Sequence, residues 1–387
     1  MSRTHSPWSL PEQVDERAEQ ADREVRMSDF MLMAFLPLRS IGVAGFPFNE
    51  FAMVALVALC LMRPARGGHR LPSLVIILVA ALLALLVYSG MANQVEWTRR
   101  VGHVGIMAAT IWALGTGRIS LRSAAIGLAT GLIAVIGLAL VGIGGDTYPG
   151  RLTGFLSDPN AGAYFIAVLG VLAVFFCDDR WKVRLGVAVP LLAGLVLTFS
   201  RTGLLAAALA LIWVFVGRRL GPVLGIALAG ALVWVVNNIP DSMTTVGPFS
   251  DRSGSDKLRD RIIAQERVQL ADAPWYGHGP GTTKVSIRDL EFFFHNSYLA
   301  TRQEGGWAAL LLVLTLLAFT FLRLSARSRR GDMGAAGAQA AIIAVAAMAI
   351  TLGEVLLDNP TAIAVGFALG HALTPEPQPA QAETPDG

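Results

Sequence analysis

The chain has 387 residues, of which 54% are hydrophobic and only 15% are charged, and its mean hydropathy is +0.56. A soluble domain carries about a quarter charged residues, so this composition excludes an ordinary soluble enzyme, a disordered chain and a disulfide-stabilised secreted domain. The apolar residues recur in runs near the roughly 20-residue length that crosses a bilayer, which predicts an all-α, polytopic integral membrane protein.

Charge and cysteine content narrow the class further. The formal net charge is +3, and in a membrane protein loop charge first of all sets orientation, so we expect membrane lipids and no nucleic acid as partners. The two cysteines, Cys60 and Cys177, lie at ends of apolar runs that are predicted to face the cytoplasm. Neither a disulfide nor a metal site is expected from them.

About twelve membrane-spanning helices are predicted within a membrane domain over residues 28–373. In chain order they cover residues 28–43, 46–62, 71–90, 101–114, 123–144, 161–176, 185–199, 203–216, 222–236, 297–322, 335–357 and 361–373. Some are shorter than the usual lower bound of about 17 residues, so eleven spans or a re-entrant segment are the alternatives. Residues 1–27 lack the apolar core of a signal peptide and are interpreted as a cytoplasmic tail, and residues 374–387 as a disordered cytoplasmic tail.

The distribution of basic residues predicts the orientation of these spans. The connections at residues 63–70, 118–122, 180–184, 218–219 and 323–330 are basic and all fall on one side. Basic connections mark the cytoplasmic side, so both termini are predicted to be cytoplasmic. Four places on the opposite side are not explained by this rule: Arg39, Arg99 with Arg100, Arg151 and Arg201.

One connection is far longer than the others. Residues 239–296, between the ninth and tenth predicted helices, form a large loop on the periplasmic face, and loops of this length are usually functional or disordered. A helix is predicted over residues 256–272, with Ser255 as its cap and Pro274 after its end. It carries Arg259 and Arg261, and a solvated charged helix is the simplest interpretation.

Two short polar turns precede predicted spans on the outer face. The turn Ser200 to Gly203 has the sequence SRTG, and Arg201 there could hold an anion, because a guanidinium binds phosphate oxygens bidentately. The alternative is that Arg201 reaches the lipid headgroups while Ser200 caps a helix. The turn ending at Asn160 has the sequence SDPN. A helix cap explains it, and a polar loop beside a substrate is the other interpretation.

The segment 292–306, FFFHNSYLATRQEGG, leads from the loop back into the membrane. An interfacial aromatic belt followed by a helix cap at Asn296 or Ser297 would account for it. However, His295 lies at the water boundary beside a hydrogen-bonding amide, and imidazole is the side chain best matched to proton transfer near neutral pH. We therefore favour a functional role for His295.

The geometry of a helix gives this segment one further expectation. If it is helical throughout, His295, Tyr298 and Arg302 share one face and Glu304 lies roughly opposite. No cluster of histidine, cysteine or carboxylate residues has metal-ligand spacing on the outer face, so a metal-dependent reaction is not expected and no cofactor is predicted.

Taken in order, these motifs resemble the O-antigen ligase and polymerase superfamily of bacterial membrane glycosyltransferases. The resemblance begins with F-x-x-x-P-N (155–160) and T-x-S-R-T-G (198–203), followed by the arginine-bearing loop helix. It ends with P-x-x-G-x-G-x-G (274–281), H-N-x-Y-L (295–299) and E-x-G (304–306). It covers residues 155–306, while the first five spans match only in general character.

The resemblance implies transfer of a glycan from an undecaprenyl-diphosphate carrier to an acceptor hydroxyl on the periplasmic face of the inner membrane. The acceptor would be lipid A core for a ligase, or a growing polysaccharide for a polymerase. By this analogy Arg201 and Arg261 hold the diphosphate, with Arg259 as the alternative to Arg261, and His295 takes the proton from the acceptor hydroxyl. Asn160, Ser200, Asn296, Tyr298 and Glu304 would support them. The implied mechanism is a metal-independent, inverting displacement.

Two other classes remain as alternatives. A polytopic transporter or lipid-linked glycan flippase has the same layout, but its ionisable groups should lie near the bilayer midplane. In this chain the middle positions of the spans are almost wholly apolar, with Glu354 as a partial exception. A scaffold subunit of a polysaccharide assembly complex is the third possibility, and it would not depend on the outer-face charges.

Overall fold

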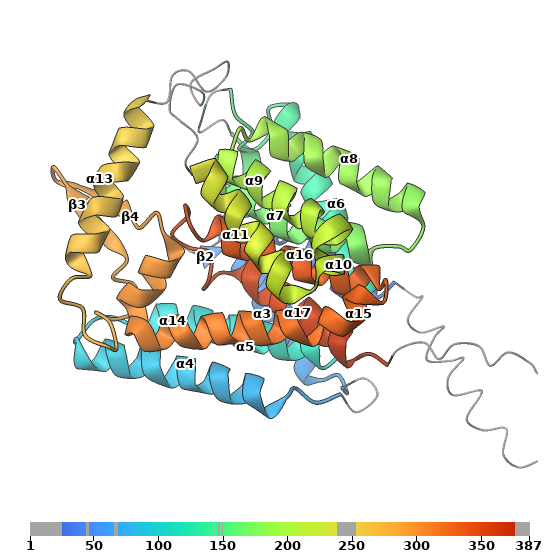
Figure 1. Ribbon diagram of the computed structural model, residues 1–387, viewed down its shortest axis with the longest axis horizontal. Coiled ribbons are helices and arrows are strands. Elements are labelled where there is room, and N and C mark those ends of the chain that lie inside the picture. The colour runs from blue at the N-terminus through green and yellow to red at the C-terminus, as the bar shows by residue number, and fades with distance from the viewer. Residues whose placement is uncertain are drawn as a thin grey trace, which may run out of the picture.

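The protein is described here by a computed structural model of residues 25–43, 46–65, 69–145, 148, 150–237 and 253–375 (Figure 1). The helices up to the large loop are α2 (Met27–Ala34), α3 (Phe48–Leu61), α4 (Ser73–Ala92), α5 (Thr98–Gly115), α6 (Leu121–Leu140), α7 (Pro159–Phe176), α8 (Trp181–Leu197), α9 (Arg201–Ile212), α10 (Arg218–Leu220) and α11 (Pro222–Asn237). After it come α13 (Ser253–Gln269), α14 (Ser297–Arg323), α15 (Ser325–Arg329), α16 (Met333–Met348) and α17 (Asn359–Leu373). A short 3-10 helix, η2 (Gly154–Leu156), precedes α7, and a π-helical turn, η3 (Trp213–Gly217), joins α9 to α10.

A helix overlaps each of the twelve predicted spans, but their lengths differ. By length and composition, five helices of the described part are long and apolar enough to cross a membrane: α4, α6, α7, the continuous segment Arg201–Leu220 and α14. The chain therefore has the architecture of a polytopic membrane protein. The count of twelve spans stays a prediction, as do the limits of the tails, since residues 1–24 and 376–387 lie outside the described part.

The described chain is mostly helical, as predicted, and two short β-hairpins are the additions to the all-α prediction. The helix α2 ends at Ala34, although the first predicted span was expected to continue to residue 43. Beyond it, the strands β1 (Gly42–Val43) and β2 (Phe46–Pro47) pair with each other. In the large loop, β3 (Lys284–Ile287) pairs antiparallel with β4 (Leu290–Phe293). Arg288 and Asp289 have φ of 51° and 66° at the turn between them, which is the left-handed geometry of a two-residue hairpin loop.

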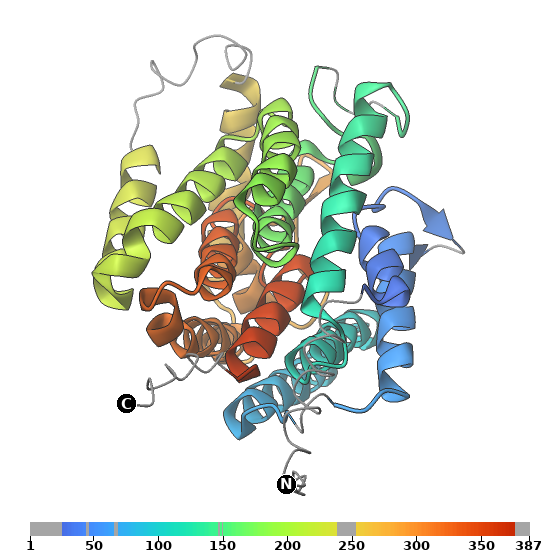
Figure 2. The same ribbon diagram turned by 90° about the vertical axis from the view of Figure 1, so that its right-hand side faces the viewer.

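Small residues allow α16 and α17 to lie in the middle of the bundle. Both helices are rich in alanine and glycine and almost wholly buried. Helices in membranes approach closely through such residues. A Cβ on Gly337 would lie 2.5 Å from the side chain of Phe175. Figure 2 shows both helices, in red, between the green helices α7 to α9 and the cyan helices α4 and α5, and α16 packs on α7 and α9 while α17 packs on α5.

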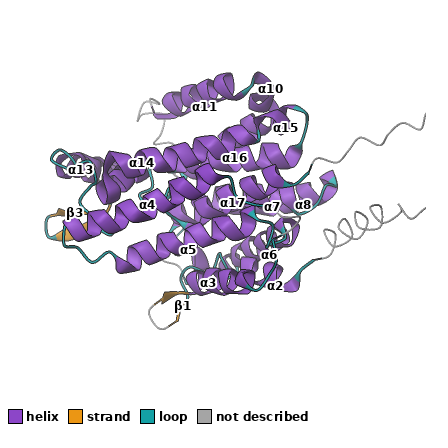
Figure 3. Cartoon of the chain, turned by 90° about the horizontal axis from the view of Figure 1, so that it is seen from below, coloured by secondary structure: helices purple, strands orange, loops and turns teal. Residues whose placement is uncertain are grey.

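The two ends of the bundle differ in chemistry. One end, called here the basic end, carries the arginine-rich connections, held by contacts such as Arg63 Nη1 to Asp29 Oδ1 at 2.5 Å and Arg218 Nη1 to the Ser328 carbonyl at 3.3 Å. The opposite end, called the His295 end, carries α13 and the β3–β4 hairpin (Figure 3). The alternation of helix directions thus separates basic connections from the large loop, as the sequence predicts.

The connection between α16 and α17 is the main correction to a predicted span. The helix expected over residues 335–357 ends at Met348, and residues 349–358 are irregular. Their backbone groups are satisfied internally: Ser297 Oγ accepts from the amides of Val355 and Leu356 at 3.2 and 2.9 Å, and the hydroxyl of Tyr164 donates to the Val355 carbonyl at 3.0 Å. Irregular backbone is tolerated inside a membrane protein when it is buried or lines a cavity.

Candidate functional site

His295 is fixed by its neighbours in the chain, because it lies between the end of β4 and the start of α14. The Phe294 amide donates to the Thr283 carbonyl at 3.1 Å, and Phe294 itself is 2% exposed. A Cβ on Gly353 would lie 1.7 Å from the Phe294 oxygen, so only glycine fits beneath this turn. Asn296 then caps α14 by accepting from two amides of the first turn.

The loop helix α13 holds His295 from the other side. The carboxylate of Glu266 accepts a hydrogen bond from the His295 amide at 2.5 Å, and Glu266 is 0% exposed. Burial raises the pKa of Glu266, while the hydrogen bond opposes this change. Sequence reasoning missed Glu266. Its spacing within the apolar stripe of α13, four residues after Ile262 and four before Leu270, was the available signal.

The charges around His295 favour its neutral form. Burial lowers the pKa of His295, the nearby guanidinium of Arg259 lowers it further, and the Asp158 carboxylate partly opposes them. A neutral imidazole can accept a proton at neutral pH. The influence of Asp158 also shows that the turn before α7 lies close to the imidazole, although the two residues are far apart in sequence.

The two arginines of α13 are placed differently. Arg259 is half-buried, and its Nε is buried with no hydrogen-bond partner among the described residues, whereas Arg261 is exposed. Residues two positions apart on an α-helix point to roughly opposite sides. Arg259 therefore faces toward His295, whose pKa it lowers, and Arg261 faces away. Arg201 is the first residue of α9 at the same end, and its neighbour Thr202 accepts a 2.7 Å hydrogen bond from Thr351 in the α16–α17 connection.

Several predicted supporting residues act as caps or clamps in this structure. Ser200 caps α9 by accepting from the Gly203 amide at 3.3 Å. Arg151 links two of the motifs, since its guanidinium donates to the Thr198 carbonyl at 2.8 Å and to Asn160 Oδ1 at 3.3 Å. The cap of α7 itself is Asp158. Both polar turns therefore cap the helices that follow them, which is the simpler of the two interpretations given for each from the sequence.

The predicted shared face of His295, Tyr298 and Arg302 is wrong, because the helix begins only at Ser297. The Tyr298 hydroxyl donates to the Ala346 carbonyl at 2.9 Å, which ties α14 to α16. The Arg302 guanidinium donates to the Leu270 carbonyl at 3.1 Å and thereby holds the end of α13. Both side chains hold the helices around His295 together and do not form a shared helix face with it.

The glycine-rich turn 274–281 docks against a kink in α14. Gly306 has φ +70° at the kink, and a Cβ there would lie 1.7 Å from the Trp275 carbonyl. A Cβ on Gly277 would lie 2.6 Å from the Gln303 carbonyl. The buried carboxylate of Glu304 accepts from Arg100 Nε at 2.8 Å and from the Gly281 amide at 3.1 Å. These glycines therefore serve backbone packing, and Glu304 joins this turn to α5.

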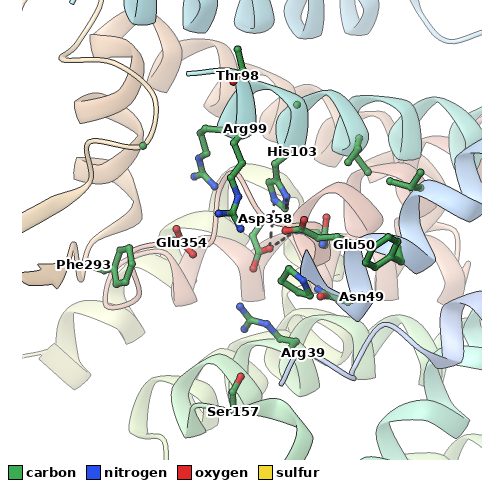
Figure 4. Close-up of a pocket in the computed structure, with 18 of the residues that line it drawn as sticks. Arg39, Asn49, Glu50, Thr98, Arg99, His103, Ser157, Phe293, Glu354 and Asp358 are labelled. Carbon is green, nitrogen blue, oxygen red and sulfur yellow. Dashed lines mark hydrogen bonds and ion pairs between the residues drawn. The ribbon is translucent and has the colours of Figure 1, made fainter. Parts of the chain in front are cut away.

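A cavity of about 940 Å³ opens beside these elements (Figure 4). Its lining does not include His295 itself, but it does include Phe293 and Ser157, which flank the segments that hold His295 and Asp158. Arg39 and Arg99 point toward the cavity from opposite sides, and Arg100 also lines it. Three of the arginines that the charge rule for membrane orientation did not explain thus line one cavity.

The cavity also holds ionisable groups that sequence reasoning missed or undervalued. The imidazole of His103 in α5 lies between two carboxylates, with Nδ1 3.5 Å from Glu50 Oε1 and Nε2 4.0 Å from Asp358 Oδ1. Glu354, on the irregular connection, is exposed to the cavity. The available signal was the position of acidic residues at the ends of predicted spans: Glu50 near the start of the second span, and Glu354 and Asp358 around the end of the eleventh. Among the described residues, no group of three or more histidine, cysteine, aspartate or glutamate side chains is placed so that it could hold a metal ion, and metal independence stays a prediction.

The fold and the site define a helical membrane protein whose polar chemistry gathers at one end of the bundle. Residues 186–314, about a third of the chain, match the O-antigen ligase family. The resemblance predicted from the motifs is thereby confirmed, and the family match suggests a membrane glycosyltransferase-type function in polysaccharide biosynthesis. The matched segment includes all the predicted site residues except Asn160. Neither a curated protein nor a solved structure matches the chain.

Proposed function

We propose that this protein transfers a glycan from an undecaprenyl-diphosphate carrier to an acceptor hydroxyl, as an O-antigen ligase or a polysaccharide polymerase. The observation that carries the proposal is the position of His295, whose amide is held by Glu266 of the loop helix and whose pKa is lowered by burial and by the guanidinium of Arg259. A base is the one catalytic group that this reaction requires from the protein, because diphosphate is already a good leaving group.

The residues divide into two roles. Arg201 and Arg259 bind the diphosphate, with Arg261 as the alternative loop arginine, and stabilise the negative charge that develops on it. Arg259 is favoured over Arg261 because it is turned toward His295. His295 accepts the proton of the acceptor hydroxyl. The acceptor oxygen forms a bond to the anomeric carbon while the bond from that carbon to the diphosphate oxygen breaks, and the electron pair leaves with the diphosphate. A direct displacement of this kind inverts the anomeric centre.

We further propose that the protein lies in the bacterial inner membrane with the His295 end in the periplasm and both termini in the cytoplasm. Its support is the set of basic connections at the opposite end, since basic connections remain cytoplasmic. Lipid-linked glycan donors and acceptors then reach the site from the outer leaflet.

Transfer in a reconstituted system tests the proposal. The purified protein is placed in liposomes with an undecaprenyl-diphosphate-linked O-polysaccharide and lipid A core, or with a lipid-linked repeat unit in place of the core. The wild type should give the transfer product with one of these acceptors. His295→Ala should lower kcat by roughly 100-fold or more, since general-base catalysis contributes about 10²- to 10⁴-fold.

The matched control is His69→Ala, because His69 lies near the basic end, in the connection before α4. It should transfer at the wild-type rate. Normal product formation by His295→Ala would remove His295 as the base, and the absence of transfer by the wild type to either acceptor would contradict the proposed reaction.

A further inference from the structure

One wall of the cavity consists of hydrogen-bond acceptors from two helix ends. The α3–α17 wall, as it is called here, comprises Asn49 and Glu50 in the first turn of α3 together with Asp358 and Asn359 at the start of α17. His103 lies between its two carboxylates (Figure 4). The matched segment 186–314 contains none of these residues.

Two acceptors of this wall have no donor. Asn49 and Asn359 are 5% and 2% exposed, and the Oδ1 of each is buried without a hydrogen-bond partner among the described residues. Leaving a buried polar group unsatisfied costs about 1–3 kcal/mol. Both residues belong to the lining of one cavity, and a small rotation of either side-chain amide would bring its Oδ1 to a donor on a bound molecule.

The chemistry of the wall selects the kind of molecule. Carboxylates accept hydrogen bonds only, whereas side-chain amides accept and donate. A sugar hydroxyl also donates and accepts, so neighbouring hydroxyls suit an alternation of carboxylate and amide. A diphosphate offers only acceptors and negative charge, so within this cavity it suits the arginines Arg39, Arg99 and Arg100 better than the carboxylates Glu50 and Asp358. The wall therefore suits the hydroxyl-bearing part of a substrate and disfavours its phosphorylated part.

We propose that the α3–α17 wall binds hydroxyl groups of the acceptor saccharide. This inference rests on the proposed function and adds to it a separate place for the acceptor. The residues proposed to hold the donor diphosphate, Arg201 and Arg259, do not line this cavity, so the donor and the acceptor saccharide would be held by different residues. The volume of about 940 Å³ lies within the range of small-ligand sites.

The wall has a clear kinetic signature. Replacing both amides in Asn49→Leu with Asn359→Leu removes the unsatisfied oxygens and keeps the branching at Cγ. The KM for the acceptor should rise at least about 10-fold, with the KM for the donor and kcat at saturating acceptor unchanged. The melting temperature should stay the same or rise, because each replaced oxygen lacked a partner in the fold. Function and stability would then change in opposite directions.

A matched asparagine with partners serves as the control. Asn93 Nδ2 donates to the carbonyls of Ser89 and Gly277 at 2.8 and 3.0 Å. Asn93→Leu should lower the melting temperature and should not raise the acceptor KM selectively. The comparison separates loss of a ligand contact from loss of a structural contact.

Direct binding keeps the result independent of turnover. Lipid A core oligosaccharide freed of acyl chains, and the repeat-unit oligosaccharide freed of its carrier, are titrated calorimetrically into the wild type in nanodiscs without donor. At least one should bind, and the Leu pair should weaken its binding at least tenfold, about 1.4 kcal/mol.

Three outcomes would overturn the inference: equal binding by the Leu pair and the wild type, a rise in the donor KM alone, or no binding of either oligosaccharide to the wild type. Failure of the wild type to transfer, with oligosaccharide binding intact, would instead reject the proposed reaction and leave the saccharide site standing.

Discussion

At the scale of single residues, the electrostatics of His295 predict a pH dependence. Burial and Arg259 both lower the pKa of His295, so the imidazole stays neutral down to a pH below its ordinary value near 6.5. The acidic limb of the pH profile of kcat/KM should therefore lie below pH 6.5. Arg259→Gln removes a charge that lowers the pKa, so it should move this limb to higher pH, besides slowing the reaction.

The neighbouring arginine provides the control for this measurement. Arg261 is on the same helix but exposed, and Arg261→Gln should leave the position of the acidic limb unchanged. If Arg259→Gln left the limb in place, or if Arg261→Gln shifted it instead, the assignment of the inward-facing arginine would be incorrect.

A second prediction at this scale concerns Glu266. Its carboxylate accepts from the His295 amide, so Glu266→Ala leaves a buried N–H group without its partner and loosens the turn that positions the imidazole. We expect kcat to fall roughly tenfold or more with little change in the donor KM. Glu266→Gln keeps an oxygen acceptor and should recover most of the rate. Equal activity of the Ala and Gln variants would rule out positioning by this hydrogen bond.

At the scale of elements, the turn 274–281 and the kink of α14 act as one unit. Gly306 has φ +70°, and its Cα faces the Trp275 carbonyl. Gly306→Ala introduces backbone strain and a steric conflict with that carbonyl. It should lower the melting temperature and transfer activity together, as followed by thermal unfolding in detergent and by the reconstitution assay.

The matched variant is Gly137→Ala. Gly137 lies within α6, and a Cβ there meets nothing within 4 Å. Alanine favours a helix over glycine, so this change should keep or slightly raise the melting temperature. A Gly306→Ala protein as stable as Gly137→Ala would show that the turn does not depend on close packing at the kink.

Sequence patterns predicted some of these elements better than others. The loop helix was expected at residues 256–272 and is α13, residues 253–269, because its apolar stripe and the following proline are local signals. The β3–β4 hairpin was missed because four-residue strands leave little alternation to detect. Residues 349–357 were assigned to a helix since hydropathy does not separate a buried helix from buried irregular backbone, whose hydrogen bonds come from Ser297 and Tyr164 on other helices.

At the scale of the whole molecule, the charge rule for membrane orientation singled out some of the residues that line the cavity. Arg39, Arg99 and Arg100 were identified as unexplained positive charges on one face, and they line one cavity. The acidic partners could not be placed from the sequence, because α3, α5 and α17 meet only through the tertiary fold. The contact of His103 with Glu50 and Asp358 depends on that packing.

The orientation of the bundle gives the last prediction. Cys60 and Cys177 are buried, and replacing both by alanine gives a background for single cysteines. Leu290→Cys places a thiol on the exposed start of β4, where Leu290 is 62% exposed, and Ala326→Cys places one on the exposed α15 at the basic end. A membrane-impermeant maleimide should label the first in intact spheroplasts and the second only after permeabilisation, because basic connections stay cytoplasmic. Labelling of Ala326→Cys in intact spheroplasts would show that the protein has the opposite orientation. The His295 end would then lie in the cytoplasm, where a periplasmic acceptor could not reach it.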